Sequence, residues 1–175
     1  MLFRFDGREP VVEEGAYVSE TAQVIGDVVI GKGSYVGHGA ILRGDYGRIE
    51  IGEGTAVEEG VIVHAPPQGV NRIGTQVTIG HGAVVHGNLI GDFSVIGMGA
   101  VTSIWSEIGS WTIVAEGAIV KLKQVLPDQV VVAGNPAAIV RDVTEKDQEL
   151  WNWGKKIYID LAQKYLDVGM ERIDA

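Results

Sequence analysis

Three of the four histidines in the 175-residue chain, His64, His81 and His86, are candidate metal ligands. The chain contains no cysteine, so a metal site would have to use imidazole nitrogens and carboxylates rather than thiolates. Three histidines leave the fourth position of a zinc ion to water, which is the arrangement of a catalytic rather than a structural site. Zinc lowers the pKa of that water to about 7 and so provides hydroxide at neutral pH.

The element that must position these histidines is a six-residue repeat. Aliphatic residues recur at every sixth position, and glycine, of which the chain has 25, often follows them directly. The repeated positions are Val12, Val18, Val24, Ile30, Val36, Leu42, Ile51, Val57, Val63, Ile73, Ile79, Val84, Ile90, Ile96, Ile108, Val114 and Val120, with Thr102 as the one polar member. A period of six fits a short strand plus a tight corner better than a helix or a hairpin strand. We therefore predict an all-β fold, a parallel β-helix of about six coils in which three repeat units close each triangular turn.

The phase of this repeat slips in three places, and the three histidines lie at or beside the slips. Three extra residues fall within 42–51, four fall within 63–73, and one residue is missing within 79–84. The ordinary alternative is that corner histidines only satisfy backbone hydrogen bonds. We favour the metal interpretation because independent breaks in the repeat place all three histidines.

Counting repeat units assigns the candidate residues to the edges of the coil. His64 and His86 fall on one edge in successive turns, and Arg43 and Asp45 fall on the same edge one turn earlier. Stacked strands lie about 4.8 Å apart, so the two histidines are close enough to share a metal ion. Arg43 and Asp45 could pair at the surface, where an ion pair contributes little. We favour a buried pair at a subunit interface, which would orient ligands and fix the contact.

His81 falls on a different edge of the coil, above Glu58. One side of the coil spans roughly 16–20 Å, so His81 cannot reach the other two histidines within one chain. Metal ligation at about 2.0–2.1 Å therefore needs His81 from a second chain, and the threefold coil predicts a cyclic homotrimer with three interfacial sites. Glu58 is placed to accept a hydrogen bond or a proton from a metal-bound water. His38 shares the edge of His81 but lies two coils away, so it is left out of the site.

The repeat fades in the last third of the chain, which is predicted to end in a helix. Thr144, followed by Asp147, resembles a helix cap, and apolar residues then recur at helical spacing. We predict a β-helix domain over residues 1–143. The segment 144–175 is predicted to hold a helix from about Thr144 to Asp167, packed on the coil or on a neighbouring chain, in a single domain overall.

The composition excludes several classes of partner. The net charge of -9 and the pI of 4.8 argue against binding to nucleic acid or to an anionic membrane surface, because both are themselves negative. The N-terminus lacks the apolar segment of a signal peptide, and no apolar run reaches the ~18 residues of a membrane span. We therefore expect a cytoplasmic protein whose partners are a small molecule and further copies of the same chain.

The residues described above resemble the gamma-class carbonic anhydrase family. They are most similar to its bacterial branch, the hexapeptide-repeat proteins of carnitine and phenylacetate operons. The resemblance runs from about residue 11 to residue 167. Its most specific parts are Leu42-Arg43-Gly44-Asp45-Tyr46-Gly47, the single His64, Ile79-Gly80-His81, His86-Gly87 five residues on, and Gly134-Asn135-Pro136-Ala137.

The resemblance implies a left-handed coil, which departs from the usual right-handed crossover rule, and a homotrimer with zinc at each interface. It also implies that His64 and His86 ligate from one chain and His81 from its neighbour, in agreement with the edge count. The implied activity is the reversible hydration of carbon dioxide to bicarbonate. The resemblance thus implies a carbonic anhydrase-like lyase.

The resemblance further implies roles for four residues around the metal. Arg43 and Asp45 form the interface pair, Glu58 positions the hydroxide, and Tyr158 on the C-terminal helix approaches the site. Where the family commonly has Gln-Asp before its first zinc histidine, this sequence has Glu58-Glu59.

Two other functions fit the same repeat. Hexapeptide-repeat acyltransferases use acetyl-CoA and a histidine base, and an acyl-CoA thioesterase would suit a zinc hydroxide. The loop 65–72 lacks the acidic residues found in the best-known anhydrases, which favours acyl-CoA chemistry. A non-catalytic metal-binding trimer is the third possibility. Iron(II) or cobalt(II) would also suit a site of three histidines.

Overall fold

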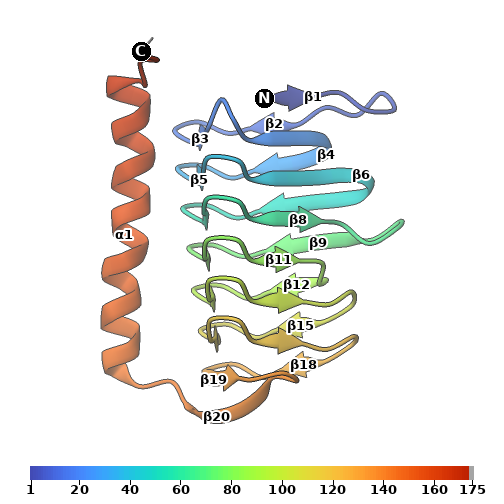
Figure 1. The fold of residues 1–175 in the computed structure, drawn as a ribbon, viewed down its shortest axis with the longest axis vertical. Coiled ribbons are helices and arrows are strands. Elements are labelled where there is room, and N and C mark those ends of the chain that lie inside the picture. The colour runs from blue at the N-terminus through green and yellow to red at the C-terminus, as the bar shows by residue number, and fades with distance from the viewer. Residues whose placement is uncertain (174–175) are drawn as a thin grey trace.

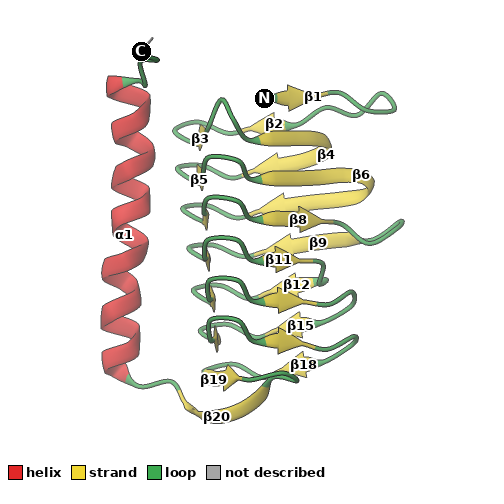
Figure 2. Ribbon diagram, in the orientation of Figure 1, coloured by secondary structure: helices red, strands yellow, loops and turns green. Residues whose placement is uncertain are grey.

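The strands of the protein wind into a left-handed parallel β-helix of about seven turns, with one long helix along its outside (Figures 1 and 2). This is a computed structural model, and it describes residues 1–173. The predicted fold class is confirmed. The coil has one turn more than the repeat predicts, because β1 pairs with β4 before the first recurring aliphatic residue at Val12. Within the described range, no helix is both long and apolar enough to cross a membrane.

Most strands are only two to four residues long, as expected for walls that turn a corner after each repeat. In the described range they are β1 (Leu2–Phe3), β2 (Val11–Val12), β3 (Tyr17–Val18), β4 (Gln23–Ile30), β5 (Tyr35–Val36), β6 (Ile41–Ile51), β7 (Ala56–Val57), β8 (Ile62–His64), β9 (Val70–Ile73), β10 (Thr78–Ile79), β11 (Val84–Val85), β12 (Leu89–Ile90), β13 (Val95–Ile96), β14 (Val101–Thr102), β15 (Glu107–Ile108), β16 (Ile113–Val114), β17 (Ile119–Val120), β18 (Val125–Leu126), β19 (Val130–Ala133) and β20 (Ala138–Asp142). The longer strands β4 and β6 continue around a corner of the coil.

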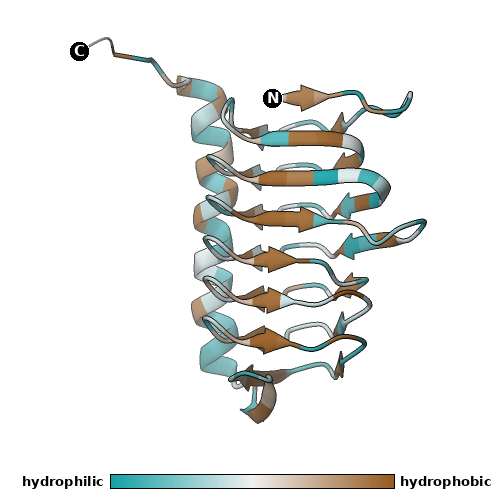
Figure 3. Cartoon of the chain, turned by 45° about the vertical axis from the view of Figure 1, so that its right-hand side comes forward, coloured by the Kyte–Doolittle hydropathy of each residue, from teal (hydrophilic) through white to brown (hydrophobic). Residues whose placement is uncertain are grey.

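These strands form three walls. One sheet has the order β17-β14-β11-β8-β6-β9-β12-β15-β18 and covers two walls, which are joined through β6. The second sheet, β20-β19-β16-β13-β10-β7-β5-β3, forms the third wall. Strand pairs in the described range are parallel except for β19 and β20, which are antiparallel. Figure 3 shows the apolar strands stacked turn upon turn.

The recurring aliphatic side chains point inward and form the core. On the wall that carries the histidines, Leu42 pairs with Val63, Val63 with Val85, and Val85 with Thr102, and all four are fully buried. Burying one such aliphatic side chain contributes about 1.5–3 kcal/mol. A slip of one residue would turn the whole row to the outside, so burial fixes the register of each strand.

The register differs from the sequence prediction at β11. The repeat predicts that Val84 points inward, and this is wrong: Val84 is partly exposed, while Val85 is fully buried in the column. The missing residue therefore lies between Val85 and Ile90. Val84 and Val85 are adjacent and equally apolar, so the six-residue pattern could not show which of them points inward. As a consequence, His86 directly follows the inward residue, as His64 does on the turn before.

The C-terminal helix α1 (Glu145–Val168) begins where the cap motif predicts. Thr144 accepts a hydrogen bond from the backbone N–H of Asp147, and the Asp147 carboxylate accepts one from the backbone N–H of Thr144. The helix lies along the wall that contains β3, β5 and β7 (Figure 1). The last two residues of the predicted segment 144–175 lie outside the described residues.

Candidate metal centre

His64 and His86 lie side by side on one edge of the coil. His64 ends β8 and His86 directly follows β11, and these two strands pair in register. The centroids of the two imidazole rings are 4.7 Å apart, and the ring planes are inclined by 34°. The backbone N–H of His86 donates to the carbonyl of Thr102 on the next turn. The ladder of the coil therefore holds both rings on the same edge, at a spacing that suits two ligands of one ion.

The Nε2 nitrogen of His86 is without a hydrogen-bond partner in the described part of the chain. This atom is also buried. Burial, with a smaller effect of His64 and Arg43, lowers the pKa of His86. The neutral form of imidazole is therefore favoured, which is the form that ligates a metal. A buried ring nitrogen without a hydrogen-bond partner is costly unless something binds it, so this atom fits a metal ligand.

Asp45 connects His64 to Arg43. One carboxylate oxygen of Asp45 lies 3.2 Å from Nε2 of His64, and the other accepts a hydrogen bond of 2.8 Å from the Arg43 guanidinium. Burial acts to raise the pKa of the Asp45 carboxyl, but the hydrogen bonds from Arg43 and His64 outweigh it and lower that pKa. Arg8 also donates to the Asp45 carbonyl oxygen. Arg43 and Asp45 therefore pair within one chain and contact a candidate ligand, while their burial at a subunit interface stays a prediction.

His81 lies on a different corner, at the turn after β10. Glu59 and then His38 occupy the same corner on the two preceding turns. The backbone N–H of Gly82, which follows His81, donates to the carbonyl of Glu59, and the N–H of Gly60, which follows Glu59, donates to the carbonyl of His38. The following Gly82 has a φ of 68°, a left-handed conformation that glycine adopts without strain. The His81 side chain is about half exposed, at 47%. The structure thus leaves this imidazole accessible to a second chain.

Two carboxylates face the ring of His81. Glu59 lies 2.8 Å from Nδ1, and Glu58 lies 3.1 Å from Nε2 while also accepting the backbone N–H of His81. Burial raises the pKa of Glu58, although the charge of His81 and a hydrogen bond from Tyr158 oppose this effect. Tyr158 lies on α1, so the helix reaches this cluster, and a role for Tyr158 at the site stays a prediction. A cavity of about 140 Å³ between α1 and the coil is lined in part by Glu58, His81 and Tyr158.

Glu59 and Tyr35 belong to the same cluster. The sequence analysis noted Glu59 only as the neighbour of Glu58 and did not single out Tyr35. The Tyr35 hydroxyl donates to Glu59 at 2.6 Å. Burial acts to raise the pKa of the Glu59 carboxyl, but the hydrogen bond from Tyr35 and other polar contacts lower it overall. The signal available for Glu59 was its position before a corner glycine, which it shares with His81.

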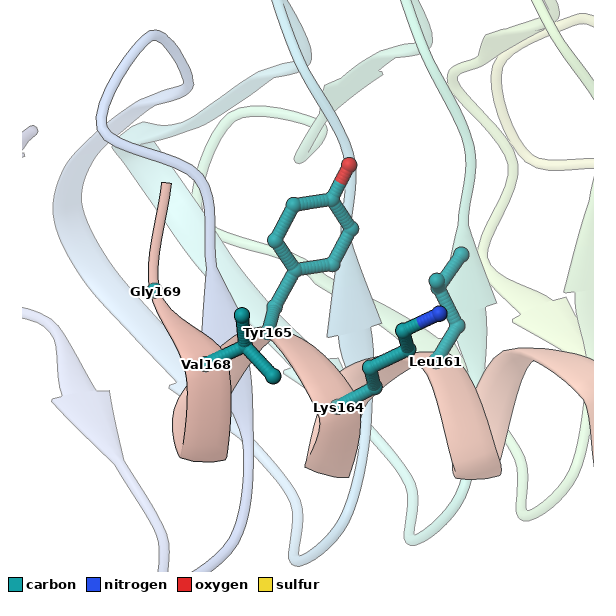
Figure 4. A pocket seen from close by; sticks show the side chains of 5 residues that line it. All are labelled: Leu161, Lys164, Tyr165, Val168 and Gly169. Atoms are coloured by element: carbon teal, nitrogen blue, oxygen red, sulfur yellow. The ribbon is translucent and has the colours of Figure 1, made fainter. Parts of the chain in front are cut away.

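The remaining histidine, His38, is already satisfied within the chain. Its Nδ1 lies 2.6 Å from the Ser19 hydroxyl, and its Nε2 lies 3.2 Å from the hydroxyl of Tyr165. Figure 4 shows Tyr165 pointing from α1 toward the coil, beside a pocket at the C-terminal end of the helix. This pocket is lined by helix residues and by none of the candidate ligands, so we do not include it in the site.

One chain therefore holds the candidate residues in two separate places. The first contains His64, His86 and the Arg43–Asp45 pair, and the second contains His81 with its carboxylates. Among the described residues, no group of three or more histidine, aspartate or glutamate side chains could hold a metal ion on its own. The structure brings two of the three predicted ligands together and leaves the third on another corner.

Comparison with known proteins gives close relatives over nearly the whole chain, although no family model matches it. Gamma carbonic anhydrase 2, mitochondrial, of Arabidopsis thaliana is 36% identical over 162 residues, which cover 89% of this chain and 58% of the relative. The chain thus spans little more than half of that plant protein. Carnitine operon protein CaiE of Escherichia coli K12 is 37% identical over 160 residues, covering 91% of this chain and 82% of the relative.

Among solved structures, the hexapeptide transferase family protein of Anaplasma phagocytophilum superposes with a TM-score of 0.88. It is 32% identical, and the match covers 94% of this chain and 97% of that one. The fold is therefore shared over nearly the whole of both chains.

Proposed function

Because the chain belongs to the family of gamma carbonic anhydrases and carnitine operon proteins, we propose that it is a metal-dependent enzyme that reversibly hydrates carbon dioxide to bicarbonate. The reaction would take place at three sites shared between the chains of a homotrimer. One observation carries this proposal: His64 and His86 lie together with a buried, unpartnered nitrogen, while the third histidine is half exposed on another corner.

The donor set fits a divalent metal. His64 and His86 of one chain would supply two nitrogens, and His81 of the neighbouring chain would supply the third. Zinc is the metal we propose, with iron(II) or cobalt(II) as alternatives that accept the same ligands. Asp45 would orient the ring of His64 through its Nε2 contact, and a carboxylate in this position also raises the basicity of a ligating imidazole.

An apolar row on the coil supports assembly into a trimer. Outward-facing branched residues lie in register on β6, β8, β11, β14 and β17, next to the histidine edge. They are Ile41, Ile62, Val84, Val101 and Ile119, and each is at least partly exposed. A contiguous apolar row on a surface marks an interaction site. Covering it with a second chain would bring the corner that carries His81 near the edge of His64 and His86.

The chain's own residues would then bind and move a proton at the site. The bound metal would supply hydroxide at neutral pH. Glu58 is buried, and its Oε2 lies 3.1 Å from Nε2 of His81. It could therefore accept a hydrogen bond or a proton from a water bound to a metal at this histidine. Tyr158 donates to Glu58 and fixes the direction of that carboxylate. The Arg43 guanidinium and Asp45 would hold His64 in position.

Acyl-CoA chemistry, as a thioesterase or an acyltransferase, is the second candidate. Its support is the 32% identity to a hexapeptide transferase family protein over nearly the whole chain, together with a loop 65–72 that carries no acidic residue. The same metal site would serve a thioesterase, because hydroxide attacks a thioester as well as carbon dioxide. A metal-binding trimer without catalysis is the outcome in which neither activity is found.

The decisive experiment is stopped-flow hydration of carbon dioxide by protein of known metal content and oligomeric state. We expect a zinc-containing trimer whose activity is lost on chelation and in His81→Ala. A zinc-loaded trimer that is inactive toward carbon dioxide but hydrolyses acyl-CoA would transfer the proposal to the second candidate. A monomer that binds zinc fully would contradict the shared site.

A further inference from the structure

A charged contact followed by a hydrogen bond leads from His81 into the interior of the protein. Nδ1 of His81 lies 2.8 Å from Oε2 of Glu59, and Oε1 of Glu59 accepts the hydroxyl of Tyr35 at 2.6 Å. Tyr35 is only 1% exposed. The carboxylate between them is therefore held at both oxygens, one by the candidate ligand and the other by a buried side chain.

The position of the Tyr35 hydroxyl is set by packing under the C-terminal helix. Its ring stacks on Tyr17 at a centroid distance of 5.6 Å, and it also meets Tyr158 at 5.3 Å and Tyr165 at 6.2 Å, both of which lie on α1. A ring surrounded in this way has little freedom to move. The helix therefore contributes to the placement of Glu59 through Tyr35.

Gly37 supplies the space in which the Glu59 carboxylate lies. A Cβ added at Gly37 would approach Oε1 of Glu59 to 2.7 Å and its Cδ to 3.0 Å. The φ of Gly37 is outside the left-handed region, so glycine is needed here for room rather than for backbone conformation. Any side chain at this position would push the carboxylate away from its place between Tyr35 and His81.

We propose that Glu59, held by Tyr35, is a positioning residue that selects Nε2 of His81 as the nitrogen offered to the metal. A neutral imidazole carries a proton on one nitrogen and a lone pair on the other. The contact of Glu59 with Nδ1 keeps the proton there and fixes the ring orientation, as partners of ligating histidines do. Nε2 is then free to exchange its contact with Glu58 for a metal ion. This inference rests on the metal site of the proposed function.

The test is metal affinity, measured on the intact trimer by competition with a zinc chelator. Glu59→Ala should weaken zinc binding by about 10- to 100-fold, the usual effect of losing such a partner. Tyr35→Phe keeps the ring and removes only the hydroxyl, and Gly37→Ala crowds both the carboxylate and the backbone nitrogen of Glu59. Both should weaken binding in the same direction by a smaller factor. The matched control is Tyr17→Phe, because its hydroxyl bonds to Ser19 and not to Glu59.

A spectroscopic readout separates positioning from general stability. In the zinc-loaded trimer, ¹⁵N shifts of labelled histidine should show the metal on Nε2 of His81 and the proton on Nδ1. In Glu59→Ala this signature should weaken, while Tyr17→Phe keeps the wild-type spectrum. Metal on Nδ1 in the wild type would overturn the inference. So would unchanged zinc affinity in a folded, trimeric Glu59→Ala protein.

The same titration distinguishes this inference from the proposed function. If wild-type protein binds no metal, or if His81→Ala binds it equally well, the metal site and the positioning role both fail. If His81→Ala loses the metal but the Glu59, Tyr35 and Gly37 variants bind like the wild type, only the positioning role fails.

Discussion

Two variants that each lack one side of the proposed site should regain metal and activity when their chains are mixed. The His81→Ala chain keeps the pair of His64 and His86, whose rings lie 4.7 Å apart, and the His64→Ala chain keeps His81. If each metal is held by that pair from one chain and by His81 from the next, neither variant alone can complete a site. A mixed trimer can do so wherever the two chains meet in the correct order.

The size of the recovery follows from the symmetry of the ring. In an equal mixture each position holds either chain with the same probability, so about one quarter of the interfaces have the required order. We expect the mixture, unfolded and refolded together, to regain about that fraction of the wild-type zinc content and hydration rate. Each variant treated alone should regain neither. Zinc assay and stopped flow on the isolated trimer give both values.

The matched control is a mixture of His64→Ala and His86→Ala chains. Both substitutions damage the pair that comes from one chain, so no arrangement of these chains produces an intact site. Chains with different tags would verify that mixed trimers form in both experiments. If the first mixture forms mixed trimers without recovery, or if the two mixtures recover equally, the assignment of His81 to the neighbouring chain is refuted.

Four further predictions concern single residues. Lys155 is buried without a hydrogen-bond partner for its Nζ in the described chain, and burial lowers its pKa to about 8. Lys155→Met should therefore raise the free energy of unfolding at pH 7 by roughly 1–3 kcal/mol. In urea titrations this gain should shrink above pH 8, where the folded wild type already holds the lysine neutral. Thr144→Ala removes the helix cap and should cost about 0.5–2 kcal/mol by the same assay. Hydrogen bonds from Arg141 and Thr144 lower the pKa of Asp147, so its share of stability is present at neutral pH and should fade as the pH falls below about 4. Glu58→Gln should keep the metal but lower kcat by about 100-fold or more if Glu58 accepts the proton; an unchanged kcat would exclude that role.

The repeat made part of the candidate site predictable. A six-residue period converts sequence distance into position on the coil, so counting units was enough to place His64 beside His86 and His81 on another edge. The period could not decide between Val84 and Val85, because both are β-branched and apolar and either could fill the column. The edge of each histidine was thus predictable, whereas its alignment within the strand depended on packing.

Side-chain partners could not be predicted from the period. Glu58 and Glu59 are adjacent acids, and which nitrogen of His81 each one faces depends on rotamers set by Tyr35 and Tyr158. These tyrosines come from β5 and α1, far apart in the sequence. Corner composition was also only partly predictable. Phe93 adopts a left-handed φ of 62° at a corner where glycine is the expected residue, and its ring stacks on that of Trp111 at 4.8 Å.

A site divided between chains would make metal binding and assembly a single equilibrium. A metal that binds only at a formed interface stabilises that interface by about 2.7 kcal/mol when its free concentration is a hundred times its Kd. The apolar row that includes Ile62 would favour association even without metal, since its burial does not depend on the histidines. Chelation should therefore weaken the trimer without changing the fold of each coil, whose core lies wholly within one chain. Because Glu59 already contacts Nδ1 of His81 in the single chain, assembly would bring an oriented ring to the neighbouring His64 and His86, where the metal would replace Glu58 at Nε2.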